Sequence, residues 1–216
     1  MSIRRSNSLP RLALAVFAAA WAGSEASATT LSGNSTADNA FAAYISTNDS
    51  VLGTYITSGD SWGTNYSFSG AALTAGVTNY LQIIATNQGG PEGFIGQFTL
   101  SDSNFQFANN TQSLLTDTAD WAGIPTVTPG TWSSPSGGAV QSYGTNGAGP
   151  WGVQSYISDA ADWIWSNPTN NGADDGNDYA FLSTPIYSEA VPEPASLALL
   201  AAGLTGLMFS RRRKRT

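Results

Sequence analysis

Between Thr29 and Ala190 the chain has no lysine, arginine, histidine, cysteine or methionine. These absences exclude a Ser-His-Asp triad, a cysteine nucleophile, a Schiff-base lysine and a histidine-based zinc site from that stretch. The one hydrolytic scheme left is a pair of carboxylates acting on a glycosidic bond, and no spacing among the acids singles out two of them. We therefore expect the stretch to be non-enzymatic.

The same stretch has no positive side chain, whereas it holds thirteen carboxylates and so has a formal charge of −13. The whole chain carries only −7 because all eight lysines and arginines lie at its two ends. Nucleic-acid binding requires cationic side chains that displace counterions, so nucleic acid is excluded as a partner of this region. Internal salt bridges are excluded too, and stability has to come from packing, hydrogen bonds and bound cations.

The first 28 residues have the three parts of a secretory signal peptide. Arg4, Arg5 and Arg11 precede an apolar run over residues 12–22, which is too short to cross a bilayer comfortably. Small residues follow, and Ala26 and Ala28 fit the positions that a signal peptidase reads. The pattern predicts cleavage after Ala28 and a mature N-terminus at Thr29.

The last 26 residues also have three parts. Val191, Pro192, Glu193 and Pro194 cannot form a helix interior, because proline lacks the N–H donor and restricts the residue before it. An uncharged apolar run over 195–209 would span about 22 Å as a helix, which is short of a hydrocarbon core of about 30 Å. The basic cluster that ends the chain consists of Arg211, Arg212, Arg213, Lys214 and Arg215, and the positive-inside rule keeps it in the cytoplasm. The pattern predicts a single short transmembrane helix with the main domain outside.

The order Val-Pro-Glu-Pro, short apolar helix, basic end over residues 191–216 resembles the PEP-CTERM sorting signal of Gram-negative bacteria, a tail also catalogued as an ice-binding protein C-terminal domain. The resemblance implies processing near Pro192 by an exosortase and a host that makes exopolysaccharide. It implies anchoring in the inner membrane before processing and a cell-surface or extracellular location afterwards. An ordinary C-terminal membrane anchor is the alternative interpretation.

Residues 29–190 show almost no helical periodicity. Short runs rich in β-branched and aromatic residues alternate with Gly, Asn, Asp and Ser clusters, which is typical of many short strands. The expected strands are 39–46, 51–56, 65–69, 80–86, 94–100, 105–108, 162–165 and 179–186. These strands predict an all-β fold, an antiparallel β-sandwich, with a jelly roll favoured over an immunoglobulin-like topology.

A looser resemblance supports this fold, because the order of several short elements is similar to that of the galactose-binding-like jelly roll. The elements are residues 73–76 leading into 80–85, then 93–98, 115–117 with Trp121, 149–152 and 161–165. The resemblance implies the fold and assigns no ligand-contacting residue. Sugar-binding members often use arginine, histidine or lysine, and this core has none.

Two sets of residues are candidates for binding. Asp174, Asp175 and Asp178 form the densest acidic cluster, in a glycine-containing loop, and oxygen ligands of this kind suit a structural Ca²⁺. A solvated acidic turn is the plainer interpretation. Trp132 and Trp151 lie in Gly- and Pro-rich loops, so they are the tryptophans expected to be exposed and to offer platforms for sugar rings.

The sequence thus favours a non-enzymatic exported surface or matrix protein that is processed by signal peptidase and exosortase and associated with exopolysaccharide. The alternative is a carbohydrate-binding module or adhesin, and a glycosidase of unknown type is a third possibility. An ice-binding face would call for a regular array of threonines, and no such period is present.

Overall fold

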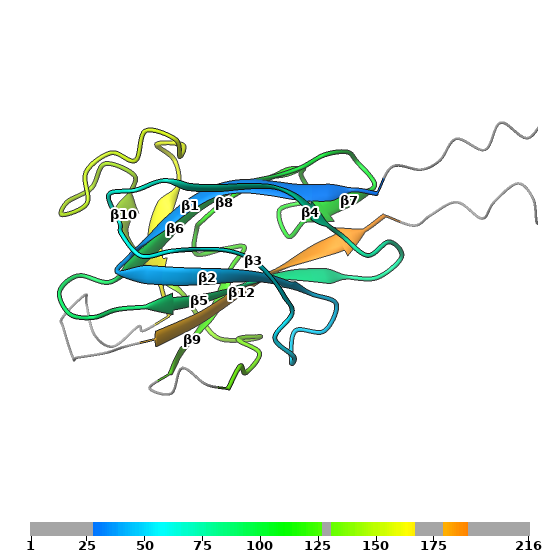
Figure 1. Cartoon of the computed structure of the whole chain (residues 1–216), viewed down its shortest axis with the longest axis horizontal. Helices are drawn as coiled ribbons and strands as arrows, with labels where there is room; N and C mark the ends of the chain where they lie inside the picture. The colour runs from blue at the N-terminus through cyan, green and yellow to red at the C-terminus, as the bar shows by residue number, and fades with distance from the viewer. Residues whose placement is uncertain (1–27, 127–130, 167–178, 190–216) are drawn as a thin grey trace, which may run out of the picture.

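A computed structural model describes residues 28–126, 131–166 and 179–189. These residues form two antiparallel six-stranded sheets that pack face to face (Figure 1). One sheet has the order β10-β11-β6-β1-β4, with β8 beside β6, and the other has the order β3-β2-β5-β12-β7, with β9 beside β12. The predicted all-β sandwich is confirmed.

The twelve strands are β1 (Thr30–Asp38), β2 (Ala40–Ser46), β3 (Thr54–Gly59), β4 (Tyr66–Ala72), β5 (Asn79–Thr86), β6 (Gly93–Leu100), β7 (Phe105–Phe107), β8 (Ser113–Leu115), β9 (Ala122–Thr126), β10 (Gln141–Thr145), β11 (Asp162–Trp165) and β12 (Tyr179–Ser188). We call the sheet that contains β1 sheet A and the sheet that contains β2 sheet B. The chain changes sheet after every strand except β2 and β10, unlike a meander.

Alternation along the strands fills the space between the sheets. On β6, Phe94 and Phe98 join the main core, while Ile95 between them joins a second cluster. On β12, Ala180 and Leu182 face the same core. These positions follow the period of two that the sequence predicts for half-buried strands.

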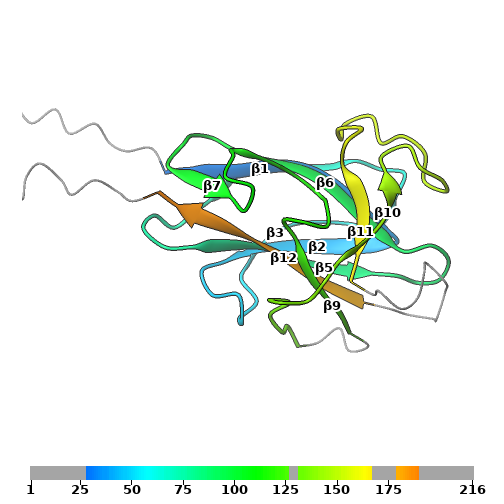
Figure 2. The ribbon, with the colours of Figure 1, turned by 180° about the vertical axis from the view of Figure 1, so that it is seen from behind.

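A second, smaller cluster covers the outer face of sheet A. It consists of Ile95, Trp151, Ile157, Ala161 and Trp163, and residues 146–161 supply three of its five members. We call residues 146–161 the cap. Figure 2 shows the cap above β10 and β11.

The eight expected strands are all present, but four further strands, β1, β8, β9 and β10, are not expected from the sequence. β1 lies in the middle of sheet A, between β6 and β4, although its sequence is mostly small and polar. Its small residues have a packing reason, because a Cβ on Gly33 would lie 2.5 Å from the ring of Phe98. β3 begins at Thr54 rather than at the expected Val51.

The two ends of the described domain lie together. β1 begins and β12 ends on the same side of the sandwich (Figure 1), and the N–H of Ser101 bonds the carbonyl of Thr30 while that of Glu189 bonds Asn104. The connection between β3 and β4 lies at the opposite end, where the Thr36 hydroxyl donates to the Ser61 carbonyl. Within the described ranges, no helix is long and apolar enough to cross a membrane.

Candidate functional site

The residues predicted for sorting lie outside the described ranges. These are Val191, Pro192, Glu193 and Pro194 of the motif, the basic cluster Arg211, Arg212, Arg213, Lys214 and Arg215, and Ala26 of the leader. Ala28 is the first described residue and is exposed. Thr29 beside it is buried, and its hydroxyl contacts both Asp102 oxygens at 2.8 and 3.0 Å. The predicted cleavage point therefore lies directly before Thr29, which Asp102 holds in the described domain.

Trp132 is not exposed, which corrects the sequence-based expectation. Its side chain is 9% exposed, its ring lies against Phe181 with centroids 4.9 Å apart, and its Nε1 donates to the Asp49 carbonyl. The physical reason is that the loop after β2 and the segment around Trp132 close over the outer face of sheet B. The Asp49 carboxylate joins them by accepting a hydrogen bond from the Ser134 hydroxyl.

Trp151 is not exposed either, which corrects the second expectation. Its ring stacks on Trp163 with centroids 4.3 Å apart and planes 21° apart, and it is 5% exposed. Its Nε1 donates to Asp38 Oδ2 over 2.8 Å in a buried contact. A loop rich in glycine and proline folds back here because a large apolar ring gains more from covering Trp163 than from meeting water.

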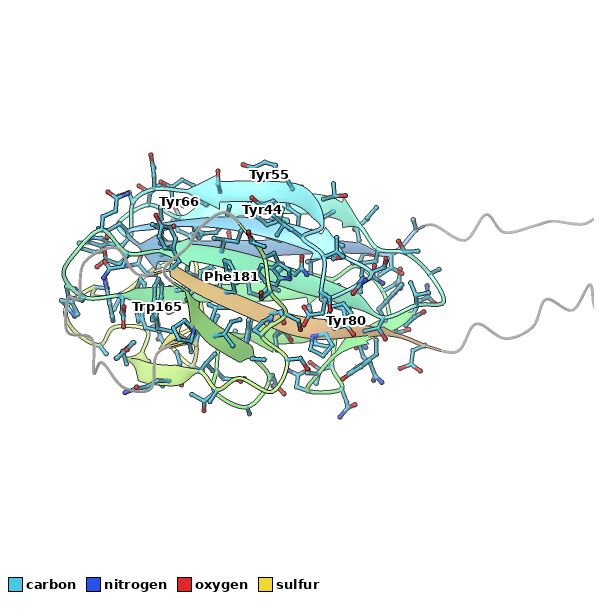
Figure 3. All side chains as sticks on the ribbon, turned by 90° about the horizontal axis from the view of Figure 1, so that it is seen from below. Tyr44, Tyr55, Tyr66, Tyr80, Trp165 and Phe181 are labelled. Atoms are coloured by element: carbon cyan, nitrogen blue, oxygen red, sulfur yellow. The ribbon has the colours of Figure 1, made fainter. Side chains whose placement is uncertain are left out.

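Other aromatic side chains take the exposed positions. Trp62, between β3 and β4, is 41% exposed, and Tyr156 of the cap is 66% exposed. Tyr55 on β3 is 57% exposed and lies edge-on to Tyr44 at 5.8 Å, at the edge of sheet B in Figure 3. Sequence reasoning missed all three, since exposure depends on which loops fold back over a sheet.

Several carboxylates of the described domain have structural partners. Burial raises the pKa of Asp38, and the hydrogen bond from Trp151 opposes this effect. Glu92, almost fully buried, accepts a hydrogen bond from the Tyr143 hydroxyl at 3.0 Å.

Two further carboxylates have shifted pKa values. Hydrogen bonds from the Asn104 backbone and the Thr29 hydroxyl lower the pKa of Asp102. Burial and the charge of Asp117 raise the pKa of Asp120. Through their hydrogen bonds, Asp38, Glu92 and Asp102 hold loops and strand ends in place.

The proposed calcium ligands Asp174, Asp175 and Asp178 lie outside the described ranges. Among the residues that the structure does describe, no three carboxylates come close enough together to hold a metal ion.

A groove of about 800 Å³ lies between β3 and β4. We call it the β3–β4 groove. Its walls are the first half of β3 and the second half of β4, completed by the end of β2 and by Leu52, Gly53 and Thr74. Its floor is the half-buried side of the main core, where Ile56, Phe68 and Ala71 pack. The two strands meet near Gly59 and Tyr66 and diverge towards Thr54 and Ala72.

The β3–β4 groove has no charged residue in its walls or floor. Its hydroxyl groups are partly used internally: the Ser46 hydroxyl donates to backbone carbonyls, and the Tyr55 hydroxyl bonds the Ser58 hydroxyl at 2.8 Å. A surface of this kind can bind a neutral partner and offers no acid or base for catalysis. The sequence carried one usable signal for it, a stretch from Ser61 to Pro91 with no charged residue.

Comparison with known protein families identifies the C-terminal tail of the chain. Residues 190–214 match the model of the PEP-CTERM protein-sorting motif, which confirms the resemblance seen in the sequence. The match covers the tail and not the sandwich. The chain matches no curated protein and no solved structure.

Proposed function

We propose that this chain is a non-enzymatic component of the extracellular matrix, held with exopolysaccharide after its tail has been processed. The PEP-CTERM motif at residues 190–214 indicates an exported protein targeted to an exosortase, membrane-anchored first and then processed. The role of the sandwich once it is outside the cell is the proposal. A leader removed by signal peptidase after Ala28 and a final location on the surface of a Gram-negative cell belong to the same proposal.

One observation carries the non-enzymatic role. The β3–β4 groove, of about 800 Å³, contains neither a carboxylate nor a basic group. Glycosidic hydrolysis needs two carboxylates facing each other across the scissile bond. Asp38, Glu92 and Asp102 instead accept hydrogen bonds from Trp151, Tyr143 and Thr29 and are engaged in the fold.

The second candidate function, a carbohydrate-binding module, is favoured by exposed aromatic side chains. Trp62 and Tyr156 are 41% and 66% exposed. They belong to the β3–β4 connection and to the cap, which lie at the end of the sandwich away from the starts of the tails (Figure 1). An anchored protein would present that end outward, where flat rings can stack on sugars.

Mutation of the motif tests the sorting step. In an exosortase-bearing host, Pro192→Ala with Glu193→Ala is expected to keep the protein in the membrane fraction, whereas the wild type reaches the surface or the medium. Glu189→Ala, an exposed change just outside the motif, is the matched control and should behave as the wild type. Normal processing of the double variant would contradict the assignment. The intact mass of the mature protein reports both cleavages, with Thr29 as the expected first residue.

Binding and hydrolysis assays separate the functions. The matrix role predicts that the protein sediments with exopolysaccharide from its host and releases no reducing ends from it. Sugar recognition through the exposed rings predicts that Trp62→Ala and Tyr156→Ala weaken that sedimentation. Tyr187→Ala is the control, because this exposed residue lies near the C-terminal end of β12, and it should leave sedimentation unchanged. Hydrolysis that disappears on changing a single acid would overturn the non-enzymatic assignment.

A further inference from the structure

The two sheets of the sandwich end on the same side in unpaired strands. β4 is the last strand of sheet A and β3 the last strand of sheet B, and they follow each other along the chain (Figure 1). Each presents one row of backbone N–H and C=O groups that no strand of the described domain pairs. We propose that a second copy of this chain docks at this side, edge strand to edge strand, across the β3–β4 groove.

The groove between these edges is where the core is least covered. Ile56 and Phe68 are only half-buried at its floor, while Leu52 and Tyr55 at its rim are 36% and 57% exposed. Contiguous apolar surface beside free strand edges is the arrangement that takes up an additional strand, whose backbone pairs with the edge and whose alternate side chains fill the groove. Docking would therefore satisfy the backbone groups and cover the core in one step.

The two edges lack several of the features that keep strands from pairing. Natural edge strands are protected by lysines, prolines, bulges or shortness. β3 and β4 have six and seven residues, with no proline and no charged residue, although each has one register irregularity against its neighbouring strand. The edges on the other side are protected, because β7 has three residues and β10 has an irregular register at Gly144, whose φ is +109°. The β3–β4 side thus offers the longer free edges, six and seven residues against three in β7 and five in β10.

Charge identifies the partner as another copy. The domain carries thirteen acids, so two copies repel each other over most approaches. From Ser61 to Pro91 there is none, and β3 adds none. Asp60 lies at the closed end, where it accepts a hydrogen bond from the Tyr66 hydroxyl, so the uncharged part of this side is the groove itself. Two copies can therefore meet groove to groove with most of their acidic surfaces apart. Each copy also presents the same free edges, as a two-fold interface requires.

Within the described ranges no segment fills this groove, and the proposed cleavages after Ala28 and near Pro192 would leave only short ends beyond them. The described sandwich begins within one residue of the predicted mature N-terminus, and the sorting motif begins directly after Glu189. A chain cut near Pro192 keeps only a stub beyond β12, which is shorter than either edge strand. A neutral glycan is the other possible occupant, but the polar groups around the groove are partly used internally, as at Ser46 and Tyr55.

The absence of cysteine from the chain allows a direct test on intact protein at the cell surface. Single changes at exposed edge positions, Ser67→Cys and Ser69→Cys on β4 and Thr54→Cys and Ser58→Cys on β3, are made one at a time. In an antiparallel two-fold pair the residues nearest the axis face their own copies closely enough for a disulfide. We expect mild oxidation to give a dimer at one or more of these positions. Ser103→Cys and Ser155→Cys, exposed elsewhere, are the matched controls and should stay monomeric. Equal yields at edge and control positions would overturn the proposal.

A charge on the edge gives the second readout. Ser69→Glu places a carboxylate from each copy in the interface, and like charges at close range cost several kcal/mol. Dimerisation of the purified mature protein, measured by sedimentation equilibrium, is expected to weaken more than tenfold, whereas Ser155→Glu should leave it unchanged. A wild type that stays monomeric at every concentration, or edge-cysteine variants that host polysaccharide protects from alkylation, would contradict docking by a second copy.

Discussion

The outer face of sheet A and the β3–β4 groove are two apolar surfaces treated in opposite ways. The cap closes the first: Trp151 stacks on Trp163 and bonds the buried carboxylate of Asp38. No segment of the described domain closes the second, although Ile56 and Phe68 lie at its floor. The surface under the cap has an acidic residue, Asp38, in contact with it, whereas the β3–β4 groove has no charged residue in its lining. An apolar surface that is left both open and neutral is suited to a partner from outside the chain.

Removing the stacking partner of the cap should produce the largest effect. Trp163 is fully buried, and Trp163→Ala is expected to cost about 3–5 kcal/mol in the free energy of unfolding, the usual range for a buried tryptophan. Urea denaturation of the mature protein measures this. Tyr156→Ala, in the cap but 66% exposed, is the control and should stay within about 0.5 kcal/mol of the wild type. Similar small losses for both variants would mean that the cap is only loosely attached.

Replacing one glycine with alanine at each surface compares how tightly the space under the cap and the β3–β4 groove are packed. A Cβ on Gly93 would lie 2.9 Å from Trp163 and 3.2 Å from Trp151, so Gly93→Ala should cost about 1–3 kcal/mol by overpacking. A Cβ on Gly70 beside the groove would meet nothing within 4 Å. The only penalty of Gly70→Ala is its φ of +75°, about 1–2 kcal/mol. Thermal or urea unfolding of both variants checks the order, and near-UV circular dichroism should change only for Gly93→Ala.

The buried carboxylate of the cap gives a prediction for pH. Burial raises the pKa of Asp38 in the folded state, so the ionised form is disfavoured there and the penalty disappears as the pH falls through that pKa. Asp38→Asn cannot ionise, and its amide oxygen can still accept from Trp151. The variant should be at least as stable as the wild type at pH 7, and its advantage should shrink as the pH is lowered towards 4.

Asp102 provides the opposite sign for comparison. Its pKa is lowered below the ordinary 3.8 by the Asn104 backbone and the Thr29 hydroxyl, so its contribution to stability is present at neutral pH and is lost in strong acid. Asp102→Asn should therefore be less stable than the wild type at pH 7. Urea denaturation of both variants as a function of pH measures these differences. If the gain in stability of Asp38→Asn over the wild type did not change with pH, the role given to the burial of Asp38 would be wrong.

The smallest expected effect concerns cations. Thirteen carboxylates without an internal base repel one another, and salt screens that repulsion over a Debye length of about 8 Å at physiological ionic strength. We propose in addition a structural Ca²⁺ at Asp174, Asp175 and Asp178. At matched ionic strength Ca²⁺ should raise the melting temperature more than Na⁺, and Asp174→Asn with Asp178→Asn should remove the difference. Equal responses to both salts would leave only screening.

The sequence predicted the parts of the molecule that follow from local pattern. Alternation of apolar residues identified strands such as β6 and β12, and the tail was recognisable from three dissimilar parts in a fixed order. β1 was missed because its small residues resemble a loop, whereas Gly33 is small because Phe98 and Phe68 lie against it. Composition alone does not reveal a contact of that kind.

The exposure of aromatic residues was predicted in the wrong direction for a related reason. Trp132 and Trp151 lie in loops that fold back, and the partners that bury them, Phe181 and Trp163, are distant in sequence. Trp62 and Tyr55 lie within or beside strands and are exposed because no segment covers that side. The β3–β4 groove exists because β3 and β4 are edge strands of their sheets. Strand order cannot be predicted from the local sequence pattern.

Amide hydrogen exchange of the mature protein, at concentrations well below and well above that of dimerisation, tests the account most directly. If a second copy pairs with the free edges, amides of β3 and β4 exchange more slowly at the higher concentration, while those of the cap, including the amide of Ile157, which is already bonded to Gln154, do not change. Exchange in β3 and β4 that is the same at both concentrations would contradict the claim that this open neutral side is the docking surface of the domain.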